Sequence, residues 1–225
     1  MINFLIVSTF LFGALIGSFL NVVILRYGTG KKILGIGERS MCFSCSKTLE
    51  WYELIPVFSF LYQRGRCRGC KSKISWQYPL VEFTTGLLFA AVAWKNFSGV
   101  SLEEAFGASN FSTTAILTLF QFVIWSILIV ITVYDIRHKI IPDFLVFMFA
   151  GLSLIASIFF PEVLGHTVTS AIVAGIAFFA FFGGLWLVSG GRWLGFGDAK
   201  LVLGVGFLLG PIQGLSALVL SFWIG

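Results

Sequence analysis

The chain has 225 residues, of which 58% are hydrophobic and only 11% are charged, and its formal net charge is +5. Soluble globular domains carry about 25% charged residues, so a soluble protein of this composition would expose large apolar areas and aggregate. A disordered chain is excluded as well, because this much apolar surface does not stay solvated. The composition therefore predicts an all-α polytopic membrane protein.

Apolar stretches long enough to cross a bilayer, which takes about 20 residues per helix, recur along the chain. The uncharged stretches are residues 3–25, 112–134 and 167–189. Two stretches are weaker candidates. Residues 144–160 form a shorter apolar stretch, and residues 79–94 contain the acid Glu82. With the last apolar segment, these stretches predict at least six transmembrane helices.

The last apolar segment begins after Asp198 and is interrupted by Gly210 and Pro211. It forms either one kinked span or a short helix followed by the start of another. Because the sequence stops within apolar residues, we expect it to be truncated at the C-terminus. We expect two domains, an N-terminal one at 1–105 and a second at 106–225.

The charged residues indicate how these spans are oriented. Ten of the fifteen basic residues lie between the first two spans, in the loop at 26–76: Arg26, Lys31, Lys32, Arg39, Lys47, Arg64, Arg66, Arg68, Lys71 and Lys73. The positive-inside rule places this loop in the cytoplasm and the N-terminus outside. Counting spans from there puts Arg137, Lys139 and Arg192 inside and Glu162 outside, which satisfies the rule again. Since the loop accounts for most of the net charge, the charge does not indicate nucleic-acid binding.

All four cysteines lie in this loop, as two C-x-x-C pairs separated by 21 residues: Cys42, Cys45, Cys67 and Cys70. Two such pairs complete a tetrahedral site, which is the usual arrangement for structural zinc. Disulfides are disfavoured by a reducing cytoplasm, and a redox-active pair by the lack of a βαβ pattern. We therefore expect a small zinc-ribbon-like domain whose metal stabilises the loop.

Two aspartates, 63 residues apart, are predicted at the same cytoplasmic membrane face: Asp135 at the end of one span and Asp198 at the start of another. Two neighbouring carboxyl groups cannot both ionise cheaply, so they share a proton. One can then activate water while the other protonates the leaving group, which is aspartic-protease chemistry. The plainer alternatives are that Asp198 is a helix N-cap and that Asp135 pairs with Arg137 in a solvated loop.

Three neighbours of Asp198 have predicted supporting roles. Gly195 and Gly197 permit close approach of a substrate strand, because they lack a Cβ atom. Lys200 either extends to the cytoplasmic surface or tunes Asp198. Asp143, which follows a proline, is interpreted as a helix cap.

With these features in view, the chain resembles the bacterial prepilin peptidases, the type IV leader peptidases of the GxGD aspartyl protease group. The matching segments cover nearly the whole chain: Gly17–Arg26 (GSFLNVVILR), the two C-x-x-C pairs, Ile55–Val57 (IPV), Ile74–Glu82 (ISWQYPLVE), Asp135 with Ile141–Asp143 (IPD), and Gly195–Leu201 (GFGDAKL). Leu54 stands where the family often has Asn.

The resemblance implies an enzyme of the bacterial inner membrane that cleaves the basic leader of type IV prepilins and related secretion pseudopilins at the cytoplasmic face. It implies that Asp135 and Asp198 are the catalytic pair. It also implies that the product's new N-terminal residue is methylated with S-adenosylmethionine, and that the cysteine-bearing part takes part in this step. The alternatives are a presenilin-like intramembrane protease, a transporter or channel with acids along its path, and a membrane scaffold whose zinc loop binds partners.

Overall fold

The computed structural model describes residues 2–29, 40–98 and 108–224. Within these ranges the chain is helical and has no β-strand apart from two isolated bridges. Lys31, Lys32 and Arg39 of the predicted basic loop, and the predicted domain boundary at 105/106, lie outside the described residues. The chain forms two compact units, Met1–Val130 and Ile131–Gly225.

Four helices of the described chain are long and apolar enough to cross a membrane. They are α1 (Ile2–Arg26), α5 (Ala108–His138), α8 (Val168–Ser189) and α9 (Phe196–Ile224). The first three coincide with the stretches expected at 3–25, 112–134 and 167–189. The prediction of an all-α polytopic membrane protein is thus confirmed.

Two further helices occupy the weaker candidate stretches. Helix α3 spans Gln77–Phe97 and carries Glu82 and Lys95, while α6 spans Asp143–Phe159 and has only 17 residues. Neither is among the four candidate spans in the described chain. The predicted count of at least six is therefore not established by the structure.

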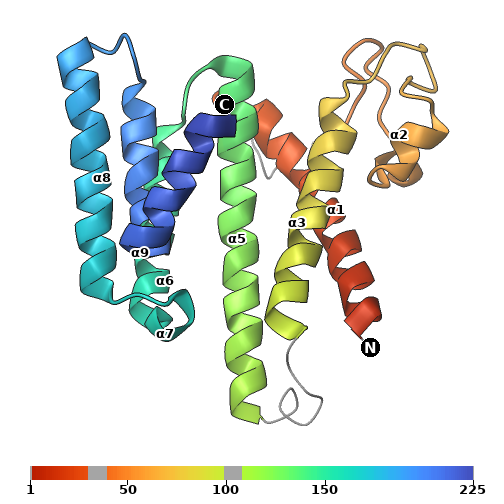
Figure 1. Ribbon diagram of the computed structural model, residues 1–225. Coiled ribbons are helices and arrows are strands. Elements are labelled where there is room, and N and C mark those ends of the chain that lie inside the picture. Colours follow the sequence, from red (N-terminus) through yellow and green to blue (C-terminus); the bar gives the residue numbers. More distant parts are fainter. Residues whose placement is uncertain (1, 30–39, 99–107, 225) are drawn as a thin grey trace. The chain divides into compact units, whose positions relative to one another are not determined.

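Unit 1 is built on α1 and α3, which run side by side in opposite directions (Figure 1). Glycines allow the close approach: a Cβ added at Gly13 would lie 2.9 Å from the Cα of Gly86, and one at Gly17 would lie 2.8 Å from the Cα of Glu82. Such small-residue contacts are typical of helix pairs in membranes. At the other end, the Phe89 ring of α3 stacks on Phe122 of α5 with centroids 4.0 Å apart.

The loop between α1 and α3 carries the remaining structure of unit 1. It contains a 3₁₀ turn, η1 (Trp51–Leu54), and a short helix, α2 (Phe58–Tyr62). Because the loop begins at the end of α1 and finishes at the start of α3, it lies at one end of this helix pair (Figure 1).

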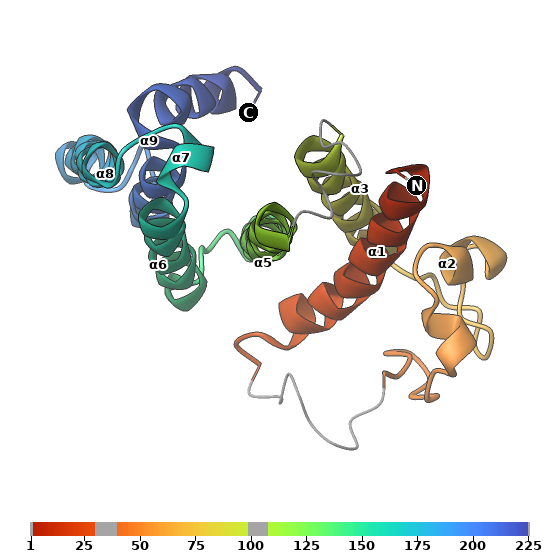
Figure 2. The same ribbon diagram turned by 90° about the horizontal axis from the view of Figure 1, so that it is seen from below.

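Unit 2 packs α6, α8 and α9 together, with α7 (Pro161–Leu164) as a turn between α6 and α8. A Cβ at Gly206 of α9 would lie 2.5 Å from the Cα of Gly175 of α8, so these two helices also meet at glycines. Helix α9 is broken at Gly210, whose φ of 68° and ψ of −169° are not helical. Figure 2 shows the last part of α9 turning away at this point. The predicted interruption at Gly210 and Pro211 is confirmed as a kink.

Candidate active site and metal centre

Asp135 lies in the last turn of α5, within unit 2. Its backbone carbonyl accepts the N–H of Lys139 at 2.7 Å, and Lys139 has a left-handed φ of 55° that ends the helix. The Asp135 side chain is partly exposed. The chain then turns through Ile141 and Pro142 into α6.

Asp198 lies in the first turn of α9, as the third residue of that helix. Its Oδ2 atom accepts the backbone N–H of Gly195 at 3.1 Å, and its own N–H donates to the Gly195 carbonyl at 3.2 Å. The Asp198 carboxylate therefore accepts the N–H of Gly195, the residue just before α9, although Asp198 itself lies within the helix. The interpretation of Asp198 as an N-cap residue is wrong, because the helix begins two residues earlier.

Asp135 and Asp198 supply one carboxyl group each to the candidate site. They come from opposite ends of two different helices, and both belong to unit 2. The close contact of Gly197 with Ile141, six residues after Asp135, brings these two helix ends together. A pair of carboxyl groups can activate a water molecule and protonate a leaving group.

Gly195 and Gly197, the two glycines just before Asp198, allow the first turn of α9 to pack closely against neighbouring residues. A Cβ at Gly197 would lie 2.9 Å from the Cβ of Ile141, so the turn preceding α9 lies against the linker between α5 and α6. A Cβ at Gly195 would lie 3.2 Å from Oδ2 of Asp198. At both positions the space that a side chain would fill is already taken by the site itself.

Lys200 forms an ion pair with Asp143, with 2.6 Å between Nζ and Oδ1. The Lys200 side chain is 15% exposed and its ammonium group lies 4.8 Å from the centre of the Phe196 ring. Asp143 is the first residue of α6, and the residue at the cap position is Pro142. The prediction that Asp143 is a helix cap is therefore wrong. Its carboxylate instead links the start of α6 to the start of α9.

In unit 1, the four cysteines come together as the sequence predicted. The sulfur atoms of Cys42, Cys45, Cys67 and Cys70 all lie within 4.8 Å of one another. The Cys42 and Cys70 sulfurs are 3.8 Å apart, and all four thiols are free. A tetrahedral zinc site with Zn–S bonds of about 2.3 Å places its sulfurs about 3.8 Å apart, so this cluster has the donors and the spacing to hold a metal ion.

The two C-x-x-C pairs lie on turns of the same form. In the first turn, the N–H of Cys42 donates to the Lys47 carbonyl, and the Cys42 carbonyl accepts the N–H of Ser46. In the second, the N–H of Cys67 donates to the Ser72 carbonyl, and the Cys67 carbonyl accepts the N–H of Lys71. An isolated bridge closes each turn, Met41 with Thr48 and Arg66 with Lys73. The residue after each second cysteine is left-handed, with a φ of 56° at Ser46 and 60° at Lys71.

In the first turn, backbone N–H groups are directed at the sulfur of Cys42. The N–H groups of Cys45 and then Ser44 lower the pKa of the Cys42 thiol to about 6, because they stabilise the thiolate. A thiolate is the form that binds a metal. The turn is therefore arranged for ligation by its backbone as well as by its side chains.

Sequence reasoning missed the role of Glu82. This carboxylate is only 7% exposed, and its Oε2 accepts the backbone N–H of Val57 at 2.7 Å. Val57 is left-handed, with a φ of 61°, and immediately precedes α2. Glu82 thus ties the cysteine-bearing loop to α3. The signal that could have found it is a single acid in an apolar stretch, which needs a specific partner.

A second missed contact joins α1 to the start of α3. The Asn21 amide, which is buried, donates to the Tyr78 carbonyl at 3.2 Å and accepts from Nε2 of Gln77 at 3.2 Å. Both partners lie within the ISWQYPLVE segment, and Asn21 lies within GSFLNVVILR. These two segments therefore pack against each other.

Comparisons with known proteins agree with this arrangement. Residues 11–96 match the bacterial peptidase A24 N-terminal domain, and residues 122–225 match the type IV leader peptidase family. No solved structure was found to match the chain.

Curated relatives are similar over most of the chain. It is 34% identical over 217 residues to the prepilin leader peptidase/N-methyltransferase of Bacillus subtilis (strain 168), which covers 96% of this chain and 78% of that protein. It is 31% identical to the Aeromonas hydrophila protein of the same name, over 96% of this chain and 77% of the relative. The Pseudomonas putida protein of that name is 33% identical, over 93% and 73%.

Proposed function

The chain belongs to the type IV leader peptidase family, and from this premise we propose that it is a membrane aspartic endopeptidase that removes the basic leader of type IV prepilins or pseudopilins. The observation that supports the proposal is that the helix ends carrying Asp135 and Asp198 both belong to unit 2, where Gly197 packs against Ile141. Asp135 and Asp198 are thus proposed as the catalytic pair, and Gly195, Gly197 and Lys200 as residues that support it.

Hydrolysis by such a pair needs no covalent intermediate. One carboxylate takes a proton from water as the oxygen attacks the scissile carbonyl, while the other carboxyl group protonates that carbonyl. As the tetrahedral intermediate collapses, the first group gives its proton to the departing amine and the second regains one from a hydroxyl of the intermediate. The two carboxyl groups end the cycle with one proton between them, as they began. A position at helix ends suits a substrate whose scissile bond lies at the membrane surface.

The test is cleavage of a membrane-embedded prepilin by Asp135→Asn and Asp198→Asn variants. Each change removes the proton exchange but keeps the side-chain size, so we expect cleavage to fall by about 10² to 10⁴-fold. Glu162→Gln, an exposed acid of α7, is the matched control and should cleave normally. Thermal unfolding of all three variants separates lost chemistry from lost fold. A variant at either aspartate that cleaves like the wild type contradicts the proposal.

We also propose that the protein N-methylates the new N-terminal residue with S-adenosylmethionine, as the names of its relatives indicate for those proteins. The described N-terminal unit, with the cysteine cluster, is the part to which we assign this step. The test is incubation with prepilin and a donor carrying a labelled methyl group. Label should appear on the cleaved product, and its absence withdraws the assignment while leaving the peptidase proposal intact.

For the cysteine cluster we propose one structural zinc ion in a zinc-ribbon-like domain. Four thiolates leave no open coordination position, so the metal would hold the loop and take no part in hydrolysis. Metal analysis of protein purified under reducing conditions should give about one zinc per chain. Cys67→Ser, at the buried ligand, should lower that content. A zinc-free wild-type protein with the same fold contradicts the proposal.

We further propose that α3 and α6 cross the bilayer as well, which with the kinked α9 gives six spans, within two domains at 1–105 and 106–225. Helix α3 has 21 residues, or about 31 Å, which is long enough for the hydrocarbon core. Its acid Glu82 has a partner, and Lys95 lies near its end. The proposed orientation has the N-terminus outside and the cysteines and both aspartates at the cytoplasmic face. Reporter fusions after Lys139 and after Glu162 should then report opposite sides.

A further inference from the structure

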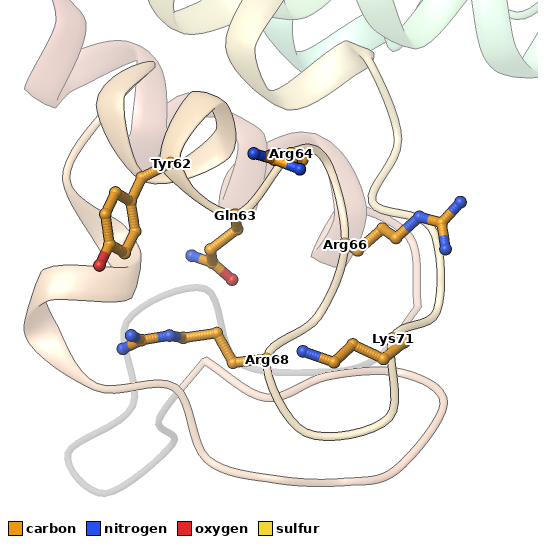
Figure 3. Close-up of a pocket in the computed structure, with 6 residues that line it drawn as sticks. All are labelled: Tyr62, Gln63, Arg64, Arg66, Arg68 and Lys71. Carbon is orange, nitrogen blue, oxygen red and sulfur yellow. The ribbon is translucent and has the colours of Figure 1, made fainter.

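A cavity of about 590 Å³ lies in the cysteine-bearing loop of unit 1. Its lining is Tyr62, Gln63, Arg64, Arg66, Arg68 and Lys71. Four of these six side chains are cationic and none is acidic. Figure 3 shows them arranged around one opening, with Tyr62, Gln63 and Arg64 from the end of α2 and the others from the second cysteine turn.

None of the four pocket cations forms an ion pair within the described residues, although the charge of Arg68 interacts at longer range with Glu53. In the ranges that the structure describes, the ion pairs are Lys47 with Glu53 and Lys200 with Asp143. Arg68 lies 5.3 Å from the centre of the Tyr52 ring and 5.7 Å from that of Tyr62. Holding four like charges around one cavity costs free energy unless an anion occupies it.

The walls of the pocket are fixed by the fold. On the α2 side, the Arg64 and Gly65 backbone N–H groups donate to Leu61 and Phe60, and the Phe60 ring fills the space beside Gly65. On the other side, the cysteine cluster holds the turn that carries Arg68 and Lys71. The cations are therefore presented by a preformed frame.

We propose that this pocket binds the phosphate of an anionic phospholipid headgroup and so holds the cysteine-bearing loop on the membrane surface. The loop starts at the end of α1 and finishes at the start of α3, which keeps it beside the headgroups if these helices cross the bilayer. Clusters of Lys and Arg at such positions recognise anionic lipids. A basic prepilin leader would be repelled from the same pocket.

The aromatic side chains of the same loop favour a lipid over a soluble anion. Tyr62, which lines the pocket, is 79% exposed, and the other large exposed aromatics of the loop are Phe43, Trp51, Tyr52, Phe58 and Trp76. Exposed Trp and Tyr side chains beside basic residues are typical of protein surfaces at the membrane interface. The pocket and the exposed rings thus fit one occupant, a lipid whose headgroup is anionic.

The test measures lipid binding to the full-length chain in detergent by native mass spectrometry, with phosphatidylglycerol or phosphatidylcholine added. The wild type should bind the first phosphatidylglycerol more tightly than phosphatidylcholine by about 100-fold or more. The triple variant Arg64→Gln, Arg66→Gln and Lys71→Gln removes three of the four cations. It leaves Arg68 unchanged, with its contacts to the Tyr52 and Tyr62 rings. Because each cation near the surface is worth about fivefold, it should bind phosphatidylglycerol about 100-fold more weakly.

The matched control removes three cations elsewhere, Arg137→Gln, Lys139→Gln and Arg192→Gln. It includes a left-handed position, as the pocket triple does, and should bind phosphatidylglycerol like the wild type. Metal content and thermal unfolding of each variant report whether the loop is folded. The single variant Lys71→Gln should bind phosphatidylglycerol about fivefold more weakly than the wild type.

Three results would overturn the inference. The first is that the pocket triple variant binds phosphatidylglycerol like the wild type. The second is that the control triple variant loses as much phosphatidylglycerol binding as the pocket triple variant. The third is that millimolar inorganic phosphate displaces the lipid, which would assign the pocket to a soluble anion. Prepilin cleavage is not among the readouts, so the peptidase proposal stands or fails separately.

Discussion

Replacing Gly197 with alanine tests whether the turn before Asp198 must lie against the linker between α5 and α6. The new methyl group would lie 2.9 Å from Cβ of Ile141, 3.2 Å from Cδ1 and 3.3 Å from Cγ1. Carbon atoms pack at about 3.5 to 4.0 Å, so the turn and the linker must separate by about 1 Å. That movement changes the distance between Asp135 and Asp198, because the linker follows one aspartate and the turn precedes the other.

The size of the effect follows from this displacement. Overpacking of this kind costs about 1 to 3 kcal/mol of stability, which leaves the protein folded. A misplacement of about 1 Å between catalytic groups costs about 100-fold in rate. Gly197→Ala should therefore cleave a membrane-embedded prepilin about 100-fold more slowly, with a much smaller change in thermal unfolding.

A second substitution makes the steric argument specific. Ile141→Gly removes all three atoms, so in combination with Gly197→Ala it should recover about tenfold of the lost rate. Gly184→Ala in α8, where nothing lies within 4 Å of the added methyl, is the control. It should cleave normally and gain up to about 1 kcal/mol of stability. Full activity of Gly197→Ala, or no recovery in the double variant, would refute the reasoning.

Three further predictions concern charges and the metal. Lys200→Met should cost about 1 kcal/mol or less in thermal unfolding, because Asp143 is 62% exposed, and a double-mutant cycle with Asp143→Asn should show that the two losses are not additive. The Glu50 N–H and Lys47 lower the pKa of Glu53 below its ordinary 4.5, so Glu53 stabilises the loop above that pH and this contribution is lost as pH falls through the lowered value. Glu53→Gln should flatten the pH dependence of loop unfolding. Chelation of zinc should make residues 40–76 sensitive to protease, whereas helices of unit 2 keep their resistance.

The features that could be predicted from the sequence are those that depend on local pattern. A span is recognisable because about 20 consecutive apolar residues suffice for it, and α1, α5 and α8 lie where such stretches were found. The cysteine cluster was predictable because each C-x-x-C turn is a local structure that presents two sulfurs together.

Contacts between helices were not predictable in the same way. The ion pair of Lys200 with Asp143 joins residues 57 positions apart, and the hydrogen bond of Glu82 to Val57 joins residues 25 apart. Hydropathy records neither, since an apolar helix can rotate about its axis without changing its hydropathy. Two helix contacts of the described residues do have a recognisable pattern. Gly13-x-x-x-Gly17 of α1 forms the contact with α3, and Gly206 of Gly206-x-x-x-Gly210 in α9 meets Gly175 of α8.

The candidate site itself shows why these distant contacts matter. A catalytic pair formed by Asp135 and Asp198 would be repulsive with both groups ionised, so it needs attractive contacts around it. Two such contacts span the same gap. The Lys200 ion pair with Asp143 is electrostatic and weakens with salt, whereas the packing of Gly197 on Ile141 is steric and does not. Because both connect the α5–α6 linker region to the start of α9, we expect the distance between the two carboxyl groups to depend on residues outside the proposed catalytic pair.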